Sequence, residues 1–252
     1  MQISSFSPQT APKGVFVVFH GLNLDPAQMH EICQTLAKAS YEVHLVALSG
    51  HKGDGIGINE VDVGLWMEES RKALEDALES AEQRCLPCFC FGYSMGAAFG
   101  CLAAVSLGLM RLKGFVFLSP AFETQVFLTP WIMLKRLPRV LQTSLNIGAY
   151  RYNARLGLMP YFAVSKAIQK LRPHLPELLK RPALVAYDLE DEVVNPRFVA
   201  SLTVRTTTWR FHEIKDRTAN CPIHHLVVNS EVLGEDTFQE LMHAITQFAE
   251  EE

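Results

Sequence analysis

The sequence lacks the features of a membrane protein or a nucleic-acid-binding protein. No apolar run is long enough to cross a membrane, and residues 1–6 have neither the charged start nor the apolar stretch of a signal peptide. Lys and Arg total 23 against 27 Asp and Glu, so no basic surplus points to nucleic acid. Internal repeats and low-complexity segments are absent as well. We therefore expect a cytoplasmic protein with no integral membrane segment and no nucleic-acid partner.

Cysteine is sparse, at six residues in 252, and its placement argues against a metal site. Cys85, Cys88 and Cys90 fall on or beside one expected buried strand, and Cys101 falls on the helix after it. A strand sends alternate side chains to opposite faces, so this group is poorly placed to surround a tetrahedral ion. Reduced thiols in the core of a cytoplasmic protein are the better interpretation.

Short apolar runs alternate with helical patterns along most of the chain. Its 252 residues, 48% apolar and 20% charged, suit one α/β domain with a large core. Continuous apolar runs are typical of strands that are buried on both faces, and the alternation predicts a mostly parallel sheet with helices on both sides. The expected strands are 14–19, 41–48, 86–91, 114–118, 183–187 and 206–214. The expected helices are 26–39, 63–83, 95–109 and 196–202, with a last one starting at Asp236 in a capping box with Gln239.

Residues 123–180 interrupt this alternation and predict an insertion. The segment mixes aromatic residues, prolines and short helical pieces, so we assign 1–122 and 181–252 to the core and 123–180 to the insertion. It carries nine Lys or Arg and two acidic residues, Glu123 and Glu177. Two interpretations of the basic surplus stay open. It forms either a solvated face or a surface that attracts an anionic head group or a membrane.

One pentapeptide carries the strongest chemical signal. Gly92-Tyr93-Ser94-Met95-Gly96 fits the G-x-S-x-G pattern of a nucleophile elbow, a sharp turn from a strand into a helix. A short apolar run precedes it and small apolar residues follow it, which is the context that the pattern requires. The flanking glycines let the two elements approach without Cβ clashes. The alternative is a Gly-rich connection in which Ser94 only caps a helix, but the context favours a nucleophile.

A serine hydroxyl becomes a nucleophile only when a base removes its proton and an acid orients that base. In an elbow protein both partners follow the serine in the chain. The loop 221–227 leaves the carboxyl ends of the strands, where the elbow also opens, so the expected base is one of His224 and His225. The candidate acids follow the strand that ends at residue 187: they are Asp188, Glu190, Asp191 and Glu192.

Two backbone amides are candidates for binding the oxyanion that a serine attack creates. Met95 directly follows the serine at the start of a helix. His20-Gly21-Leu22 follows an early strand, and Gly21 allows a turn that presents the amide of Leu22 to the same site. The alternative for His20-Gly21 is an ordinary turn at the end of a strand. A mechanism built from these groups requires no cofactor and no metal.

Together these motifs resemble the α/β-hydrolase superfamily. Within it they look most like small bacterial carboxylesterases and monoacylglycerol-lipase-like enzymes, including serine aminopeptidase-like lysophospholipases. The similarity extends over residues 15–248. Its pieces are the His-Gly turn at 20–21, Leu48-Ser49-Gly50-His51, the elbow, Asp191-Glu192-Val193-Val194 and His224-His225-Leu226.

The resemblance implies a fold, a site and an activity. It implies the α/β-hydrolase fold with residues 123–180 as a small helical lid, and hydrolysis of carboxylic esters through an acyl-enzyme. The substrates implied are short- to medium-chain acyl esters or monoacylglycerol-like lipids. The same triad also serves thioester, amide and carbon–carbon bond hydrolysis, and a non-catalytic binding protein on this fold is the second class. Carried over by position, the nucleophile is Ser94, the acid Asp191 and the base His224, with Leu22 and Met95 forming the oxyanion hole.

Two positions depart from the family pattern. Asp188 stands where the family usually has a glycine, three residues before the acid. Ile223 precedes a pair of histidines, whereas relatives often have Gly or Ser before a single histidine. Neither departure removes a catalytic group, and His225 stays open as the base.

Overall fold

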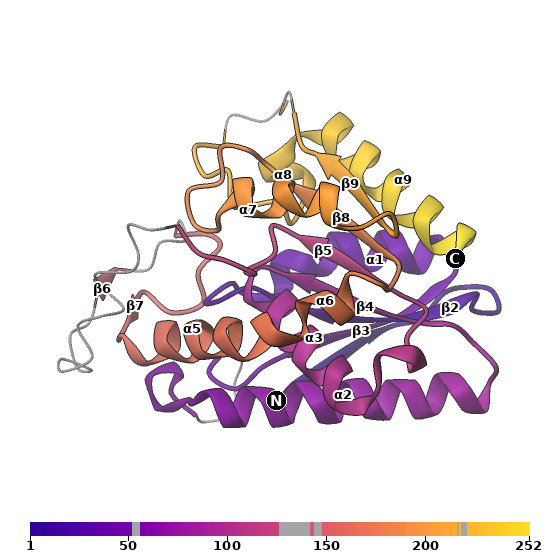
Figure 1. Cartoon of the computed structure of the whole chain (residues 1–252), viewed down its shortest axis with the longest axis horizontal. Helices are drawn as coiled ribbons and strands as arrows, with labels where there is room; N and C mark the ends of the chain where they lie inside the picture. Colours follow the sequence, from indigo (N-terminus) through magenta and orange to yellow (C-terminus); the bar gives the residue numbers. More distant parts are fainter. Residues whose placement is uncertain (52–55, 126–141, 144–147, 216, 218–220) are drawn as a thin grey trace.

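A seven-stranded sheet forms the centre of the molecule (Figure 1). The computed structural model describes residues 1–51, 56–125, 142–143, 148–215, 217 and 221–252. The first strand of the sheet is antiparallel to its neighbour and all other neighbouring pairs are parallel, which confirms the expected sheet. In spatial order the strands are β1 (Gln2–Phe6), β3 (Tyr41–Ala47), β2 (Gly14–Phe19), β4 (Cys88–Tyr93), β5 (Gly114–Leu118), β8 (Ala183–Tyr187) and β9 (Trp209–Glu213). A separate pair joins β6 (Gln142–Thr143) to β7 (Arg155–Leu156).

Helices cover both faces of the sheet because its strands present apolar side chains in both directions (Figure 1). In β2, Val15 and Val17 join one buried cluster, whereas Phe16 and Val18 join the other. The first cluster includes α2, α3 and α5, and the second includes α1 and α9. The helices are α1 (His30–Lys38), α2 (Val63–Gln83), α3 (Met95–Leu107), α5 (Met159–Leu171), α6 (Leu175–Leu178), α7 (Pro196–Ser201), α8 (Ser230–Leu233) and α9 (Glu235–Glu251).

The two ends of the chain differ from the sequence prediction. Strand β1 was not expected, because it lies at the sheet edge and its side chains are only partly buried. The last helix begins at Glu235, and the predicted capping box is wrong. Gly234 precedes the helix without a side-chain cap, and Gln239 donates a hydrogen bond to the Glu235 carboxylate at 2.9 Å instead.

Parts of residues 123–180 are joined to the rest of the molecule at several places. Helix α5 packs against α2 and α3 within the first buried cluster. Thr124 forms a bridge with Val194, and Arg151 forms one with Leu24. The division into core and lid stays a prediction. Part of the basic group lies outside the described residues: Lys135, Arg136 and Arg139.

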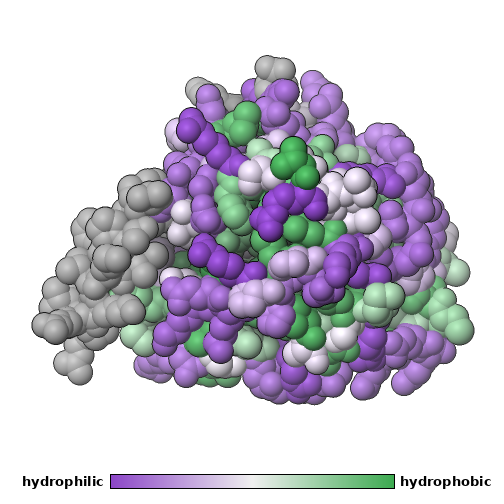
Figure 2. All heavy atoms as spheres, viewed as in Figure 1, coloured by the Kyte–Doolittle hydropathy of each residue, from purple (hydrophilic) through white to green (hydrophobic). Residues whose placement is uncertain are grey.

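None of the described helices combines the length and the apolar character that a membrane span needs. On the face seen in Figure 2, hydrophilic residues surround smaller groups of apolar ones.

Candidate active site

The turn between β4 and α3 has the backbone geometry of a nucleophile elbow. Ser94 lies between the two elements with φ 52° and ψ −120°, a conformation that non-glycine residues rarely adopt. Hydrogen bonds hold this conformation. The Ser94 amide donates to the Leu118 carbonyl at 3.0 Å, and the Ser94 carbonyl accepts from the amides of Ala97 and Ala121 at 3.1 and 3.0 Å. Strained backbone of this kind persists only where surrounding contacts enforce it, and it concentrates at functional sites.

Both glycines of the pentapeptide are required by close packing. A Cβ atom at Gly92 would lie 2.4 Å from the Cα of Ala97, so strand and helix could not approach as they do. A Cβ atom at Gly96 would lie 2.2 Å from the carbonyl oxygen of Phe19 in β2. The sequence pattern therefore corresponds to two tight contacts, one within the turn and one between the first turn of α3 and the end of β2.

A hydrogen-bonded chain leads from Ser94 through His225 to Asp191. The Nε2 atom of His225 lies 2.8 Å from the Ser94 hydroxyl, and its Nδ1 lies 2.8 Å from Oδ2 of Asp191. This arrangement suits a tautomer in which Nδ1–H donates to the carboxylate and Nε2 accepts from the serine. The three residues are buried, with 5% of Ser94, 2% of Asp191 and 5% of His225 exposed.

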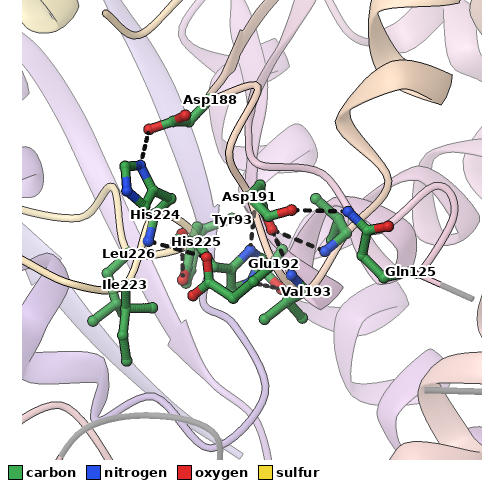
Figure 3. Close-up of polar contacts among 12 residues, drawn as sticks. Tyr93, Gln125, Asp188, Asp191, Glu192, Val193, Ile223, His224, His225 and Leu226 are labelled. Carbon is green, nitrogen blue, oxygen red and sulfur yellow. Dashed lines mark hydrogen bonds and ion pairs between the residues drawn. The ribbon is translucent and has the colours of Figure 1, made fainter. Parts of the chain in front are cut away.

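The Asp191 carboxylate is held in its charged form. Burial alone would raise its pKa, but His225 and the amides of Val193 and Val194, which donate to Oδ1 at 2.8 and 2.9 Å, outweigh burial and lower it. Gln125 supports the same turn by donating to the Asp191 carbonyl at 2.9 Å (Figure 3). A charged, fixed carboxylate at Nδ1 can stabilise an imidazolium when the base takes a proton.

The structure places His224 away from Ser94, which corrects the position expected for it. Its Nδ1 lies 2.9 Å from the Asp188 carboxylate (Figure 3). Its Nε2 lies 3.2 Å from the Glu190 carboxylate. The two neighbouring histidines point in different directions from one turn, so only one of them faces the serine. The motif resemblance favoured the first histidine as the base, and the residues themselves had left the second open. The structure brings the second, His225, to the Ser94 hydroxyl, and its role as the base stays a prediction.

The loop after β2 lies against the elbow, as expected for an oxyanion loop. A Cβ atom at Gly21 would lie 3.2 Å from the Cβ of Ser94 and 2.5 Å from the Tyr93 ring, so this position must be glycine. Leu22 follows directly and packs at the edge of the first buried cluster. Met95 opens α3, where amides of the first turn have no acceptor within the helix. The structure thus places Gly21, the residue before Leu22, against Ser94, and Met95 directly after Ser94 at the start of α3. The role of the Leu22 and Met95 amides in binding an oxyanion stays a prediction.

Two buried histidines fasten this loop to the loop after β3. His20 donates from Nδ1 to the Gly21 carbonyl at 2.7 Å and accepts at Nε2 from the Leu48 amide at 3.1 Å. His51 accepts at Nε2 from the Asn23 amide at 2.9 Å. Both rings are fully buried, and burial lowers the pKa of His20 to about 4 and that of His51 well below its ordinary value. Both are therefore neutral structural groups at pH 7.

Three residues near the site escaped the sequence prediction. Besides Gln125, these are Tyr93, whose hydroxyl donates to the His225 carbonyl at 3.1 Å, and Arg217, which lies beside the loop of His225. Tyr93 fills a variable position of the elbow pattern, and Arg217 belongs to no recognisable motif, so neither carries a sequence signal. Among the described residues, no group of three or more His, Cys, Asp or Glu is arranged to hold a metal ion.

Comparison with known families gives one match by sequence. The model of the family described as serine aminopeptidase, S33, matches residues 10–156, which is more than half of the chain. A search of curated proteins finds no match.

Comparison with solved structures finds the same fold in several lipolytic proteins. A structure from work on LipS and LipT, two metagenome-derived lipolytic enzymes, has a TM-score of 0.79 at 17% identity and covers 100% of this chain and 98% of that one. A soluble variant of monoglyceride lipase from Saccharomyces cerevisiae has a TM-score of 0.76 at 13% identity, covering 98% and 90%. Paleococcus ferrophilus monoacylglycerol lipase has a TM-score of 0.72 at 17% identity, covering 98% and 97%. At such identities the likeness concerns the fold alone.

Proposed function

The chain belongs to the serine aminopeptidase, S33, family and has the α/β-hydrolase fold, and from this premise we propose that it is a serine hydrolase that cleaves carboxylic esters. The observation that carries the proposal is the chain of two 2.8 Å contacts from Ser94 to His225 to Asp191. It begins at a serine whose backbone is held at φ 52°. A buried serine, histidine and carboxylate in this order form a nucleophile, its base and the acid that orients the base.

In the proposed reaction the Ser94 hydroxyl attacks the acyl carbonyl while Nε2 of His225 takes its proton. The imidazolium then returns this proton to the leaving alcohol, and an acyl-enzyme is formed. Water attacks the acyl-enzyme with His225 again acting as the base, which releases the acid and restores the serine. Asp191 keeps Nδ1–H in place throughout and stabilises the positive ring, consistent with its lowered pKa.

The amides of Leu22 and Met95 are the proposed donors to the tetrahedral oxyanion. Support comes from the contact of the Gly21 turn with Ser94 and from the place of Met95 in the first turn of α3. Fixed donors of this kind act where charge develops, and loss of one typically costs roughly 10²- to 10³-fold in rate.

The proposed substrates are short- to medium-chain acyl esters or monoacylglycerol-like lipids. Support comes from the neighbours named as lipolytic enzymes and monoacylglycerol lipases. We also propose a cytoplasmic setting, because all six cysteines are free thiols, as is usual in reducing compartments.

Ester turnover by three variants tests the assignment of the base. We expect Ser94→Ala and His225→Gln each to lower kcat on p-nitrophenyl butyrate by roughly 10⁴-fold, since loss of either member disables the unit. His224→Gln should keep most of the activity, because its ring contacts Asp188 and Glu190 rather than the serine. Repeating the assay with acyl chains of graded length measures the substrate range.

His224→Gln is the matched control, since it makes the same substitution one residue away. An inactive His224→Gln beside an active His225→Gln would return the base to His224. Turnover by wild-type protein on none of the esters would reject ester hydrolysis.

A further inference from the structure

The guanidinium of Arg217 donates hydrogen bonds to the backbone of the loop that carries His225. Arg217 donates from Nη1 to the carbonyl oxygen of Leu226 at 2.9 Å and, at 3.4 Å, to that of Ile223. Its Nη2 donates to the carbonyl oxygen of His224. Three carbonyls that flank His225 on both sides therefore accept from one side chain. The remaining carbonyl, that of His225 itself, accepts from the hydroxyl of Tyr93 at 3.1 Å.

The same guanidinium is anchored on the loop that carries the acid. Its Nε donates to Oδ2 of Asp188 at 2.9 Å, and both side chains are only 7% exposed. Asp188 lies three residues before Asp191, and its Oδ1 accepts from the amide of Glu190 at 2.8 Å, which fixes the carboxylate in the turn. Arg217 thus connects the loop that carries Asp191 to the loop that carries His225.

The chemistry of this connection requires arginine. The guanidinium is planar and carries five N–H donors, so it can serve a carboxylate and several carbonyls at once, whereas a lysine ammonium is a compact point charge. A buried ion pair is a weak source of stability compared with apolar packing. The ion pair between Arg217 and Asp188 instead fixes the positions of the two side chains and of the carbonyls to which Arg217 donates. Asp188 is also the position at which the sequence departs from the glycine of the family pattern.

We propose that Arg217, anchored by Asp188, is a positioning residue that fixes the loop of His225 so that the ring reaches Ser94 and Asp191 together. This inference rests on the proposed function. Arg217 touches no reacting atom in it and acts only through the backbone of residues 223–226. A displacement of about 1 Å in a catalytic group can cost roughly 10²-fold in rate. Loss of the hydrogen bonds from Arg217 to this loop should therefore lower kcat and leave substrate binding unchanged.

Two substitutions of Arg217 distinguish a role in positioning the loop of His225 from a role in neutralising the charge of Asp188. Arg217→Lys keeps a positive charge for Asp188 but cannot reach the carbonyls as well, whereas Arg217→Met removes both functions. We expect each variant to lower kcat on p-nitrophenyl butyrate by about 30- to 100-fold with KM changed less than about twofold. The downfield NMR signal of the proton between His225 and Asp191, identified by its loss in His225→Gln, should broaden or disappear in both. Arg205→Met is the matched control, since Arg205 is exposed on the surface.

The outcomes distinguish this inference from the proposed function. A folded Arg217→Lys variant with kcat within about twofold of wild type and an unchanged downfield signal would overturn the positioning role. If Arg217→Met fails to fold, the Arg217→Lys result alone decides. Wild-type protein that neither hydrolyses esters nor reacts with a fluorophosphonate would instead reject the proposed function itself.

Discussion

Single residues at the elbow are constrained by contacts that leave no room for a larger side chain. Gly96 faces the backbone of Phe19 and His20, with carbonyl atoms 2.2 to 2.8 Å from the place of a Cβ atom. Backbone atoms at the end of strand β2 cannot shift as the end of a flexible side chain can. The conformation of Ser94 and the spacing between β2 and α3 therefore both depend on the glycine.

A methyl group at position 96 should destabilise the protein. We expect Gly96→Ala to lower the free energy of unfolding by at least about 2 kcal/mol, because overpacking against fixed backbone forces the helix away from the sheet. Gly57→Ala is the control, since its Cβ would meet only Glu60 side-chain atoms at 3.5 Å or more, and it should change stability by less than about 0.5 kcal/mol. Urea unfolding followed by circular dichroism measures both, and equal effects would contradict the explanation.

Among single residues of the site, the sequence predicts those that belong to a local motif. The elbow was recognisable because its two glycines and its serine fall within five residues. The acidic turn offered four carboxylates, and only the family resemblance selected Asp191 among them. The choice between His224 and His225 depended on the path of the loop, which sets the side of the turn that each ring occupies. Arg217 had no pattern at all, because its partners lie on two loops that only the folded chain brings together.

At the scale of elements, the loops after β2 and β3 form one unit through their neutral histidines. The rings of His20 and His51 lie 4.3 Å apart, and each accepts a backbone amide from the opposite loop. Protonation of either ring would place a charge in a buried position and remove an acceptor. The loop that carries Leu22 should therefore be a source of acid sensitivity.

The lowered pKa of His20 predicts the direction and range of this sensitivity. Its pKa is 6.5 in the unfolded chain and about 4 in the fold, so the unfolded state binds the extra proton first as the pH falls. The free energy of unfolding should thus decrease from pH 6.5 to pH 4, by up to about 3 kcal/mol for this residue, and His51 acts in the same direction. Asp191 contributes only at lower pH, since its pKa lies below the ordinary 3.8.

Urea unfolding at several pH values between 7 and 4.5 measures this effect. His20→Gln is the informative variant, because it is less stable at pH 7 but has one group fewer to protonate, so its stability should depend less steeply on pH. An identical pH dependence in wild type and variant would show that another group is responsible.

Element positions were predictable where apolar runs are long and regular, as for β2, β4 and α2. Edge and terminal features were not. The half-exposed strand β1 has no continuous apolar run, and Gly234 replaces the predicted side-chain cap of α9. Both depend on neighbours that are distant in the sequence.

At the scale of the whole molecule, the parallel sheet assembles the site from distant segments. Strands β4, β8 and β9 run in the same direction, so the turns that follow them meet at one edge of the sheet. Ser94, Asp191 and His225 are brought together in this way although about 130 positions separate the first from the last. The order of strands and helices predicted this meeting, whereas the boundary of the insertion at 123–180 depends in part on residues outside the described ones.

Covalent trapping shows whether Ser94 is a nucleophile that His225 activates. Fluorophosphonate treatment followed by peptide mass spectrometry should show one adduct on Ser94 in wild-type protein and none in Ser94→Ala. His225→Gln should react at least about 100-fold more slowly, because the serine then lacks its base. Wild-type protein that forms no adduct, or an adduct on another residue that persists in Ser94→Ala, would rule out Ser94 as the nucleophile.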